Sequence, residues 1–161
     1  MKIALASDHA GYDLKIGIIG FLKKRGIEFR DFGCGPGEKV DYVDYAEKAI
    51  QGIEKKEFDR AILVCGTGLG MSIVANKYRG IRATPCWDEY VAEMSRKHND
   101  SNCLTLGGRI LPLDEALQIV QIWLDTHFEE GRHQMRLKKL LQVEERNFKS
   151  KNRSKDNGFI S

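Results

Sequence analysis

The sequence predicts an α/β fold in which helices cover both faces of a five-stranded, mainly parallel sheet. Three observations lead to this prediction. Short apolar segments alternate with longer amphipathic ones along most of the chain. The segment Arg60–Cys65 contains AILVC, a continuous apolar run that is typical of a strand buried on both faces. No internal repeat or low-complexity linker interrupts the alternation, so a single domain over residues 1–148 is predicted.

The first elements are assigned from periodicity and from glycine. Lys2–Ser7 is a predicted strand, and Ile27–Phe32 is a second one. A helix is predicted over Tyr12–Arg25 and ends at Gly26. Its apolar stripe consists of Leu14, Ile18, Phe21 and Leu22. The segment Gly33–Lys39 contains three glycines and a proline, which predicts a loop.

The spacing of apolar residues also assigns the rest of the chain. Apolar residues spaced three or four apart mark helices, and short apolar runs mark strands. The predicted strands are Arg60–Cys65, Ile81–Cys86 and Asn102–Leu106. The predicted helices are one through Val43–Ile53, one from the glycine-rich turn to about Lys77, Asp88–Lys97, one through Leu113–Leu124, and Arg132–Phe148.

The charge of the chain is concentrated in a tail. The net charge is +3, and residues 149–161 alone sum to +3, so the remainder is close to neutral. A nucleic-acid-binding fold needs clustered basic charge on its body, so no nucleic-acid partner is expected. The polar basic tail is predicted to be disordered and solvated. No apolar run approaches the roughly 20 residues that span a bilayer, so no membrane partner is expected.

The four cysteines are expected to be reduced thiols. They are Cys34, Cys65, Cys86 and Cys103. The chain opens on a strand-like MKIALAS rather than on a secretory signal, which favours a cytoplasmic protein. No pair has CxxC spacing, so neither a zinc site nor another metal or cofactor is predicted.

Ligands of such folds bind at the carboxyl ends of the strands, and the strongest motif lies there. Cys65 ends a buried strand, and Gly66, Gly68 and Gly70 alternate with Thr67 and Leu69 before a helix. Glycines allow several N–H groups to point at one anion, and a thiol near a helix N-terminus ionises more readily. The alternative is a tight turn beside a structural cysteine. The loop lacks the GK[ST] ending of a nucleotide-binding P-loop.

Further candidates lie at element ends, and each has a plain structural alternative. Asp8 and His9 follow the first strand and suit proton transfer or binding of a sugar hydroxyl or phosphate, or Asp8 merely caps a helix. His98 and Asn99 close a helix, where such residues are common without function. Tyr42 opens a helix and either contacts a ligand or packs.

Three arginines complete the candidate set. Arg132 and Arg136 are four residues apart on a predicted helix, so they share a face and suit a phosphate clamp or a solvated basic face. Arg109 follows Gly107-Gly108 at a strand end and is either a third anion ligand or a loop charge. Taken together, a thiol, an oxyanion cradle, histidines and arginines suit proton abstraction beside a carbonyl of a phosphorylated substrate.

These residues resemble those of the ribose-5-phosphate isomerase B type, within the wider group that includes galactose-6-phosphate isomerase. The matching stretches are SDHAG, DY, CGTGLGMSIVANK, GIRA, RKHNDSNCLTLGGR and GRHQMR, at positions 7–11, 41–42, 65–77, 80–83, 96–109 and 131–136. The resemblance implies a Rossmann-like three-layer α/β/α sandwich that works as a homodimer or a dimer of dimers with shared active sites. It also implies that D-ribose 5-phosphate and D-ribulose 5-phosphate are interconverted through an enediolate without a metal.

The resemblance also implies roles for the candidate residues. Cys65 is the base that moves a proton between C1 and C2, assisted by Thr67 and the loop amides of Gly66–Gly70. His98 opens the sugar ring with Asp8 as a polar partner, and Asn99 holds the sugar. The phosphate ligands are His9, Arg109, Arg132 and Arg136, and Tyr42 lines the sugar site. Some relatives use a carboxylate in the stretch Met71–Lys77, which here contains no acid.

The sequence departs from the family pattern at two places, and two alternative functions remain. Val43 stands where many relatives have proline, and the tail extends past the usual end. A hexose-6-phosphate isomerase acting on allose or galactose 6-phosphate is the nearest alternative function. A non-catalytic phosphosugar-binding module is a weaker one, because a binder needs no thiol base.

Overall fold

The computed structural model describes residues 1–151, which fall into two compact units. The first unit is Met1–Phe128 and contains all the strands described, and the second begins at Glu129. The second unit consists mainly of helix α6 (Arg132–Lys151). The helix continues three residues into the predicted tail, and the rest of that tail lies outside the described residues. The prediction of one domain over residues 1–148 stays a prediction.

The sheet has five strands in the order β2-β1-β3-β5-β4, and every pairing is parallel. The strands are β1 (Lys2–Ser7), β2 (Glu28–Asp31), β3 (Arg60–Cys65), β4 (Ala83–Pro85) and β5 (Cys103–Gly107). The chain places β2 on one side of β1 and β3 on the other. The gap between the carboxyl ends of β1 and β3 is therefore a topological switch point, where open α/β sheets bind ligands.

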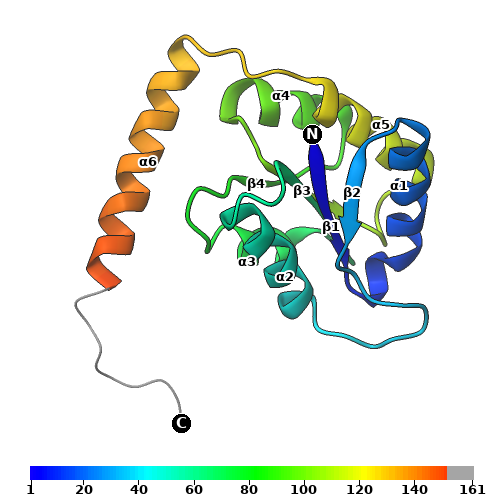
Figure 1. Cartoon of the computed structure of the whole chain (residues 1–161). Coiled ribbons are helices and arrows are strands. Elements are labelled where there is room, and N and C mark those ends of the chain that lie inside the picture. The colour runs from blue at the N-terminus through cyan, green and yellow to red at the C-terminus, as the bar shows by residue number, and fades with distance from the viewer. Residues whose placement is uncertain (152–161) are drawn as a thin grey trace. The chain divides into compact units, whose positions relative to one another are not determined.

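Helices cover both faces of the sheet and give three layers (Figure 1). The helices of the first unit are α1 (Tyr12–Lys24), α2 (Tyr42–Glu54), α3 (Leu69–Ala75), α4 (Glu89–Asn99) and α5 (Leu113–Asp125), preceded by the short 3₁₀ turn η1 (His9–Gly11). One face carries α1, α4 and α5, and the other carries α2 and α3. The predicted α/β class and three-layer sandwich are confirmed.

Two apolar cores follow from the two-residue period of the strands. In β1, Ile3 and Leu5 face the core under α1 and α5, whereas Ala4 and Ala6 face the core under α2. The small alanines allow α2 to pack closely on the sheet. Trp123 of α5 is fully buried in the first core and is among its largest side chains.

Every predicted strand and helix is present, and only some limits differ. The predicted strand Ile81–Cys86 shortens to Ala83–Pro85. At its start, the N–H of Ile81 donates to the carbonyl of Tyr78 and that of Arg82 to the side chain of Asn102, so neither joins the ladder with β5. The helix predicted to reach about Lys77 ends at Ala75. Its C-cap, Asn76, instead uses its side-chain amide to bond both the N–H and the carbonyl of Ala83, each at 2.9 Å.

The structure has no candidate for a membrane-spanning helix within its described residues: none combines the necessary length with the necessary apolar character.

Candidate active site

Backbone hydrogen bonds draw three loops together at the carboxyl edge of the sheet. The N–H of Asp8, after β1, donates to the carbonyl of Val64 in β3 at 3.2 Å. The N–H of Gly108, after β5, donates to the carbonyl of Cys65 at 2.7 Å, and that of Arg109 donates to Gly66 at 3.1 Å. The predicted residues at the ends of β1, β3 and β5 therefore lie around one point, the switch point of the sheet.

Cys65 lies at the centre of this edge, on the last residue of the middle strand β3. Its side chain is buried, with 5% exposed, and its Sγ accepts a hydrogen bond from the N–H of Gly68 at 3.2 Å. Gly68 has the left-handed φ of +80°, and a Cβ there would lie about 3.0 Å from the backbone of Leu106. Only glycine fits this conformation and this space, so the residue that donates to the thiol is fixed by the turn itself.

The other cysteines have a different environment. Burial raises the pKa of the Cys86 thiol to about 12, and it also raises the pKa of Cys103. Both thiols stay protonated at neutral pH and are poor nucleophiles or bases. All four cysteines are free thiols. Cys65 differs from these two in that its Sγ accepts an amide hydrogen bond at the carboxyl edge of the sheet.

Thr67 and Arg109 lie beside the same loop. The Oγ1 of exposed Thr67 accepts a hydrogen bond from the N–H of Leu69 at 3.3 Å. A Cβ built on Gly66 would lie 3.5 Å from Cδ and 3.6 Å from Nη1 of Arg109, so the arginine packs against the glycine. Its positive charge adds to the field of the loop amides, which favours an anion here.

Asp8 and His9 lie at the end of β1. The Oδ1 of Asp8 accepts hydrogen bonds from the N–H groups of Ala10 and Gly11 at 2.9 and 3.0 Å. The capping role considered for Asp8 is thus confirmed, and the residue is buried at this edge. His9 is exposed, and its Nδ1 lies 3.1 Å from the carbonyl oxygen of Val40 and 3.5 Å from the backbone nitrogen of the same residue.

Tyr42 reaches the loop from the first turn of α2. Asp41 caps that helix through a hydrogen bond from the N–H of Val43 to its Oδ1 at 2.9 Å. The ring of Tyr42 lies against Gly70 of α3, where a Cβ would be 2.7 Å from ring atom Cε2. The exposed hydroxyphenyl group therefore borders the same edge as Cys65.

His98 and Asn99 lie at the opposite edge of the sheet. They end α4, and the chain then enters β5 through Asn102, whose carbonyl accepts the N–H of Ala61 at 2.9 Å. Ala61 and Cys65 are four residues apart on β3, a separation of about 13 Å along a strand. Within one chain, the structure therefore does not bring His98 and Asn99 to Cys65, and it does not pair Asp8 with His98.

Arg132 and Arg136 belong to the second unit. Both are exposed on α6, where they are one helical turn apart, as predicted. Nε of Arg132 donates to Nε2 of His133 at 3.2 Å. The two guanidinium groups are available to one anion on the face of this helix.

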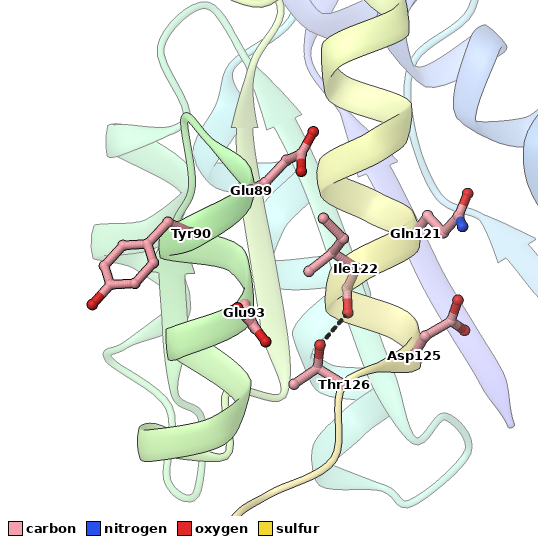
Figure 2. Close-up of a pocket in the computed structure, with 7 residues that line it drawn as sticks. All are labelled: Glu89, Tyr90, Glu93, Gln121, Ile122, Asp125 and Thr126. Carbon is pink, nitrogen blue, oxygen red and sulfur yellow. Dashed lines mark hydrogen bonds between the residues drawn. The ribbon is translucent and has the colours of Figure 1, made fainter.

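Two concave surfaces of the protein differ in whether predicted site residues line them. A cavity of about 250 Å³ adjoins Thr67 at the carboxyl edge. It is lined by Thr67, Leu69, Pro85, Cys86, Trp87, Gly107, Ile110 and Leu111. A larger groove of about 610 Å³ runs between α4 and α5, and it contains none of the predicted site residues (Figure 2). Two of its carboxylates form ion pairs, Glu93 with Lys97 and Asp125 with Arg25.

Comparison with known proteins agrees with this geometry. The family model described as Ribose/Galactose Isomerase matches residues 3–140 of the chain. The chain belongs to the ribose/galactose isomerase family.

Individual members of the ribose/galactose isomerase family are similar over nearly their full length. The chain is 44% identical to ribose-5-phosphate isomerase B of Escherichia coli (strain K12), covering 90% of this chain and 97% of that protein. It is 51% identical to the solved structure of ribose-5-phosphate isomerase B from Clostridium thermocellum, with a TM-score of 0.89 and coverage of 91% and 99%. The structure of the Mycoplasma genitalium enzyme with bound ribulose-5-phosphate is 36% identical, with a TM-score of 0.83 and coverage of 89% and 96%.

Sequence reasoning missed two charged residues of this family member that join separate parts of the chain. Lys15 is almost fully buried, and its Nζ donates to Asp31 Oδ2 and to the carbonyl of Cys34, both at 2.9 Å. A lysine next to the apolar stripe of the first helix was the available signal. Asp100 follows His98 and Asn99, and its carboxylate binds two arginines. Roles were predicted only for His98 and Asn99, the first two residues of the motif HND.

Proposed function

We propose that this chain interconverts D-ribose 5-phosphate and D-ribulose 5-phosphate through an enediolate, with Cys65 as the base. The observation that carries the proposal is the position of the Cys65 thiol. It lies at the switch point of the sheet, under the N–H of Gly68 and beside the loop that Arg109 borders. The N–H donor and the positive charge of Arg109 favour negative charge at this point of the sheet.

The proton transfer requires a base and a place for negative charge. The Cys65 thiolate takes the C2 proton of the open-chain aldose and returns it to C1. The amides of Gly66–Gly70 stabilise the oxygen that becomes negative in between, and Thr67 assists proton movement at the oxygens. The proposed chemistry needs no metal, because amides and guanidinium groups supply the positive field. Turnover is expected to be unchanged after exhaustive chelation.

Substrate binding is assigned to the remaining residues of the edge and to α6. His9 and Arg109 contact the phosphate, together with Arg132 and Arg136. Tyr42 lines the sugar site, and Asp8 holds the loop that carries His9. Asn99 holds the sugar near its carbonyl end.

Ring opening is assigned to His98, and it requires a second copy of the chain. Ribose 5-phosphate is mainly a closed ring, so a proton must move before C2 becomes acidic. Because His98 and Asn99 lie at the amino edge of their own sheet, we propose that they serve the Cys65 of a partner in a homodimer or a dimer of dimers. The free state of all four cysteines favours a reducing compartment, and we propose the cytoplasm.

A hexose-6-phosphate isomerase is a second candidate, because the description of the matching family names galactose as well as ribose. One additional carbon requires a longer pocket between the proton-transfer site and the phosphate ligands. The same residues would perform the same chemistry.

Deuterium exchange observed by NMR tests the proposal. The purified protein is mixed in heavy water with ribose 5-phosphate, and with allose or galactose 6-phosphate in parallel. Deuterium in the ribulose 5-phosphate that forms is the expected result. Exchange with a hexose phosphate alone would move the assignment to the second candidate. No exchange with any of the three sugar phosphates would indicate a binding module.

The variant Cys65→Ala tests the base. A positioned base contributes about 100- to 10,000-fold in rate, so kcat is expected to fall by at least that lower factor. Competitive inhibition by inorganic phosphate should remain, because the phosphate ligands are untouched. Full activity of the variant would refute the assignment of Cys65.

A further inference from the structure

The turn that follows His98 and Asn99 has an unusual backbone. Asp100 is the C-cap of α4 and has a φ of +44°, in the left-handed region that non-glycine residues seldom occupy. Such a conformation persists only where the surroundings hold it in place.

The carboxylate of Asp100 joins two arginines. Its Oδ2 accepts from Nη2 of Arg82 at 2.9 Å, and its Oδ1 accepts from Nη1 of Arg96 at 2.8 Å. The side chain of Arg96 is 6% exposed, and that of Arg82 is 21% exposed. The side chain of Asp100 keeps 36% of its surface exposed, so the two charge-assisted bonds restrict its geometry mainly because the arginines that donate them are largely buried.

Both arginines also bind the backbone on either side of the turn. Nε of Arg82 donates to the carbonyls of Asn99 and Asp100 at 3.0 and 2.9 Å. Nη1 of Arg96 donates to the carbonyl of Ser101, and its Nε donates to that of Thr126 at 3.3 Å. The last turn of α4 is thus fixed by side chains from the segment before β4 and from α4 itself.

The carboxylate of Asp100 also offsets positive charge in this region. Arg60 and Arg96 lie near the ring of buried Trp123, 5.3 and 6.0 Å from its centroid. Burial, together with repulsion from Arg96, lowers the pKa of Arg60 to about 10, and the carboxylates of Asp100, Asp59 and Asp125 oppose the shift. Of these carboxylates, Asp100 bonds Arg96 directly, whereas Asp125 bonds Arg25.

We propose that Asp100 is a positioning residue which, through Arg82 and Arg96, holds His98 in the orientation needed for ring opening. This inference rests on the proposed function, in which His98 opens the ring of ribose 5-phosphate. Asp100 touches no substrate in this scheme. Its effect is confined to the step that His98 performs.

Two reactions of the enzyme separate ring opening from proton transfer. Ribose 5-phosphate must open before it reacts. Ribulose 5-phosphate cannot close a five-membered ring, because its C5 oxygen carries the phosphate, so it reaches the enediolate directly. Exchange of its C1 hydrogen with heavy water, followed by NMR, therefore reports on Cys65 without His98.

The experiment compares Asp100→Asn with His98→Asn and with Asp125→Asn as the matched control. Asn tolerates the left-handed backbone, so the first variant removes mainly the charge. Asp125 is also a carboxylate held by an arginine, through two hydrogen bonds of 2.8 and 3.0 Å from Arg25, but it borders neither His98 nor Cys65. For each protein, kcat and KM with ribose 5-phosphate and the exchange rate of ribulose 5-phosphate are measured.

For Asp100→Asn, kcat with ribose 5-phosphate is expected to fall about 10- to 100-fold, the effect of misplacing a catalytic group by about 1 Å. KM and the exchange rate should stay within about twofold, and Asp125→Asn should match the unchanged protein. A parallel loss of kcat and exchange, or no loss, would overturn the inference. If Asp100→Asn does not fold, Arg82→Gln leaves the Arg96 pair intact and is expected to give the same selective loss.

The reference variant keeps the two proposals apart. If His98→Asn lowers kcat and exchange equally, or neither, the ring-opening role of His98 is wrong. If His98→Asn loses kcat selectively and Asp100→Asn does not, only the inference about Asp100 fails.

Discussion

The ring of Tyr42 covers the backbone of Gly70 so closely that a Cβ at position 70 would lie 2.7 Å from Cε2 and 2.9 Å from Cζ. The two residues come from α2 and α3, on the same face of the sheet. Gly70 therefore sets how far the tyrosine can approach the loop that carries Cys65.

The variant Gly70→Ala is expected to displace Tyr42 and to raise KM for the sugar phosphate about five- to tenfold, the loss of roughly one hydrogen bond. The value of kcat should change less, because the Gly68–Cys65 contact is untouched. Gly20→Ala is the matched control, since a Cβ on Gly20 meets nothing within 4 Å. That control should keep KM and gain about 0.5–1 kcal/mol in unfolding free energy. An unchanged KM in Gly70→Ala would remove Tyr42 from the sugar site.

Mixed dimers test the shared active site. Cys65→Ala and His98→Asn homodimers are each expected to have low activity with ribose 5-phosphate. After unfolding and refolding an equal mixture, half of the dimers carry one chain of each kind, and one of their two sites is intact. The mixture should recover about a quarter of the activity of the unchanged protein. Activity that stays at the level of the two parents would place Cys65 and His98 of the same chain in one site.

Lys15 is expected to be a major contributor to stability. Removing one partner of a buried ion pair costs about 3–5 kcal/mol, and Lys15→Met should lie near 3 because Asp31 keeps 31% of its side chain exposed. Lys2→Met is the control, because the Lys2–Glu28 pair is 41% and 68% exposed and should cost below about 1 kcal/mol. Urea unfolding measures both. Equal losses in the two variants would show that burial of the Lys15 pair has no consequence.

Stability is expected to fall at alkaline pH because of Cys86. Its pKa is raised by burial from the ordinary 9.0 to about 12, so between these values the unfolded chain loses a proton that the folded chain keeps. The stability that the protonated thiol provides is complete below pH 9 and is lost as the pH rises towards 12. The slope is at most about 1.4 kcal/mol per pH unit for each thiol. Cys103 acts in the same direction.

Urea unfolding at several pH values checks this expectation. Cys86→Ala should have a shallower decline above pH 9 than the unchanged protein, and the same slope between pH 6 and 8. An identical decline in both proteins would assign the alkaline loss to other groups.

The order and type of the elements could be predicted from the sequence because helices and strands differ in the spacing of their apolar residues. Arg60–Cys65 was predicted at both limits, since the five residues after Arg60 form a continuous run of buried apolar side chains. The edge strand β4 was predicted too long. Its limits depend on pairing with β5 and on the side chain of Asn76, which no local pattern reveals.

The site was predictable only where chemistry follows directly from a strand end. Asp8, Cys65 and Arg109 were found in this way, and the structure groups them. Lys15 and Asp100 were missed because their importance comes from tertiary contacts, the first with Asp31 and the second with Arg82 and Arg96. The separation of His98 from Cys65 within one chain could not be predicted either. Both residues lie at the ends of predicted elements, and only the sheet topology shows that these ends are at opposite edges of the sheet.

The two tryptophans lie at opposite edges of the sheet and in contrasting surroundings. Trp87 follows β4 at the carboxyl edge and is 59% exposed, whereas Trp123 is fully buried at the amino edge between Arg60 and Arg96. Their fluorescence therefore separates by accessibility: acrylamide should quench Trp87 and spare Trp123. The protein thus contains an optical reporter beside the loop that follows Cys65 and another beside Arg60 and Arg96, without any added label.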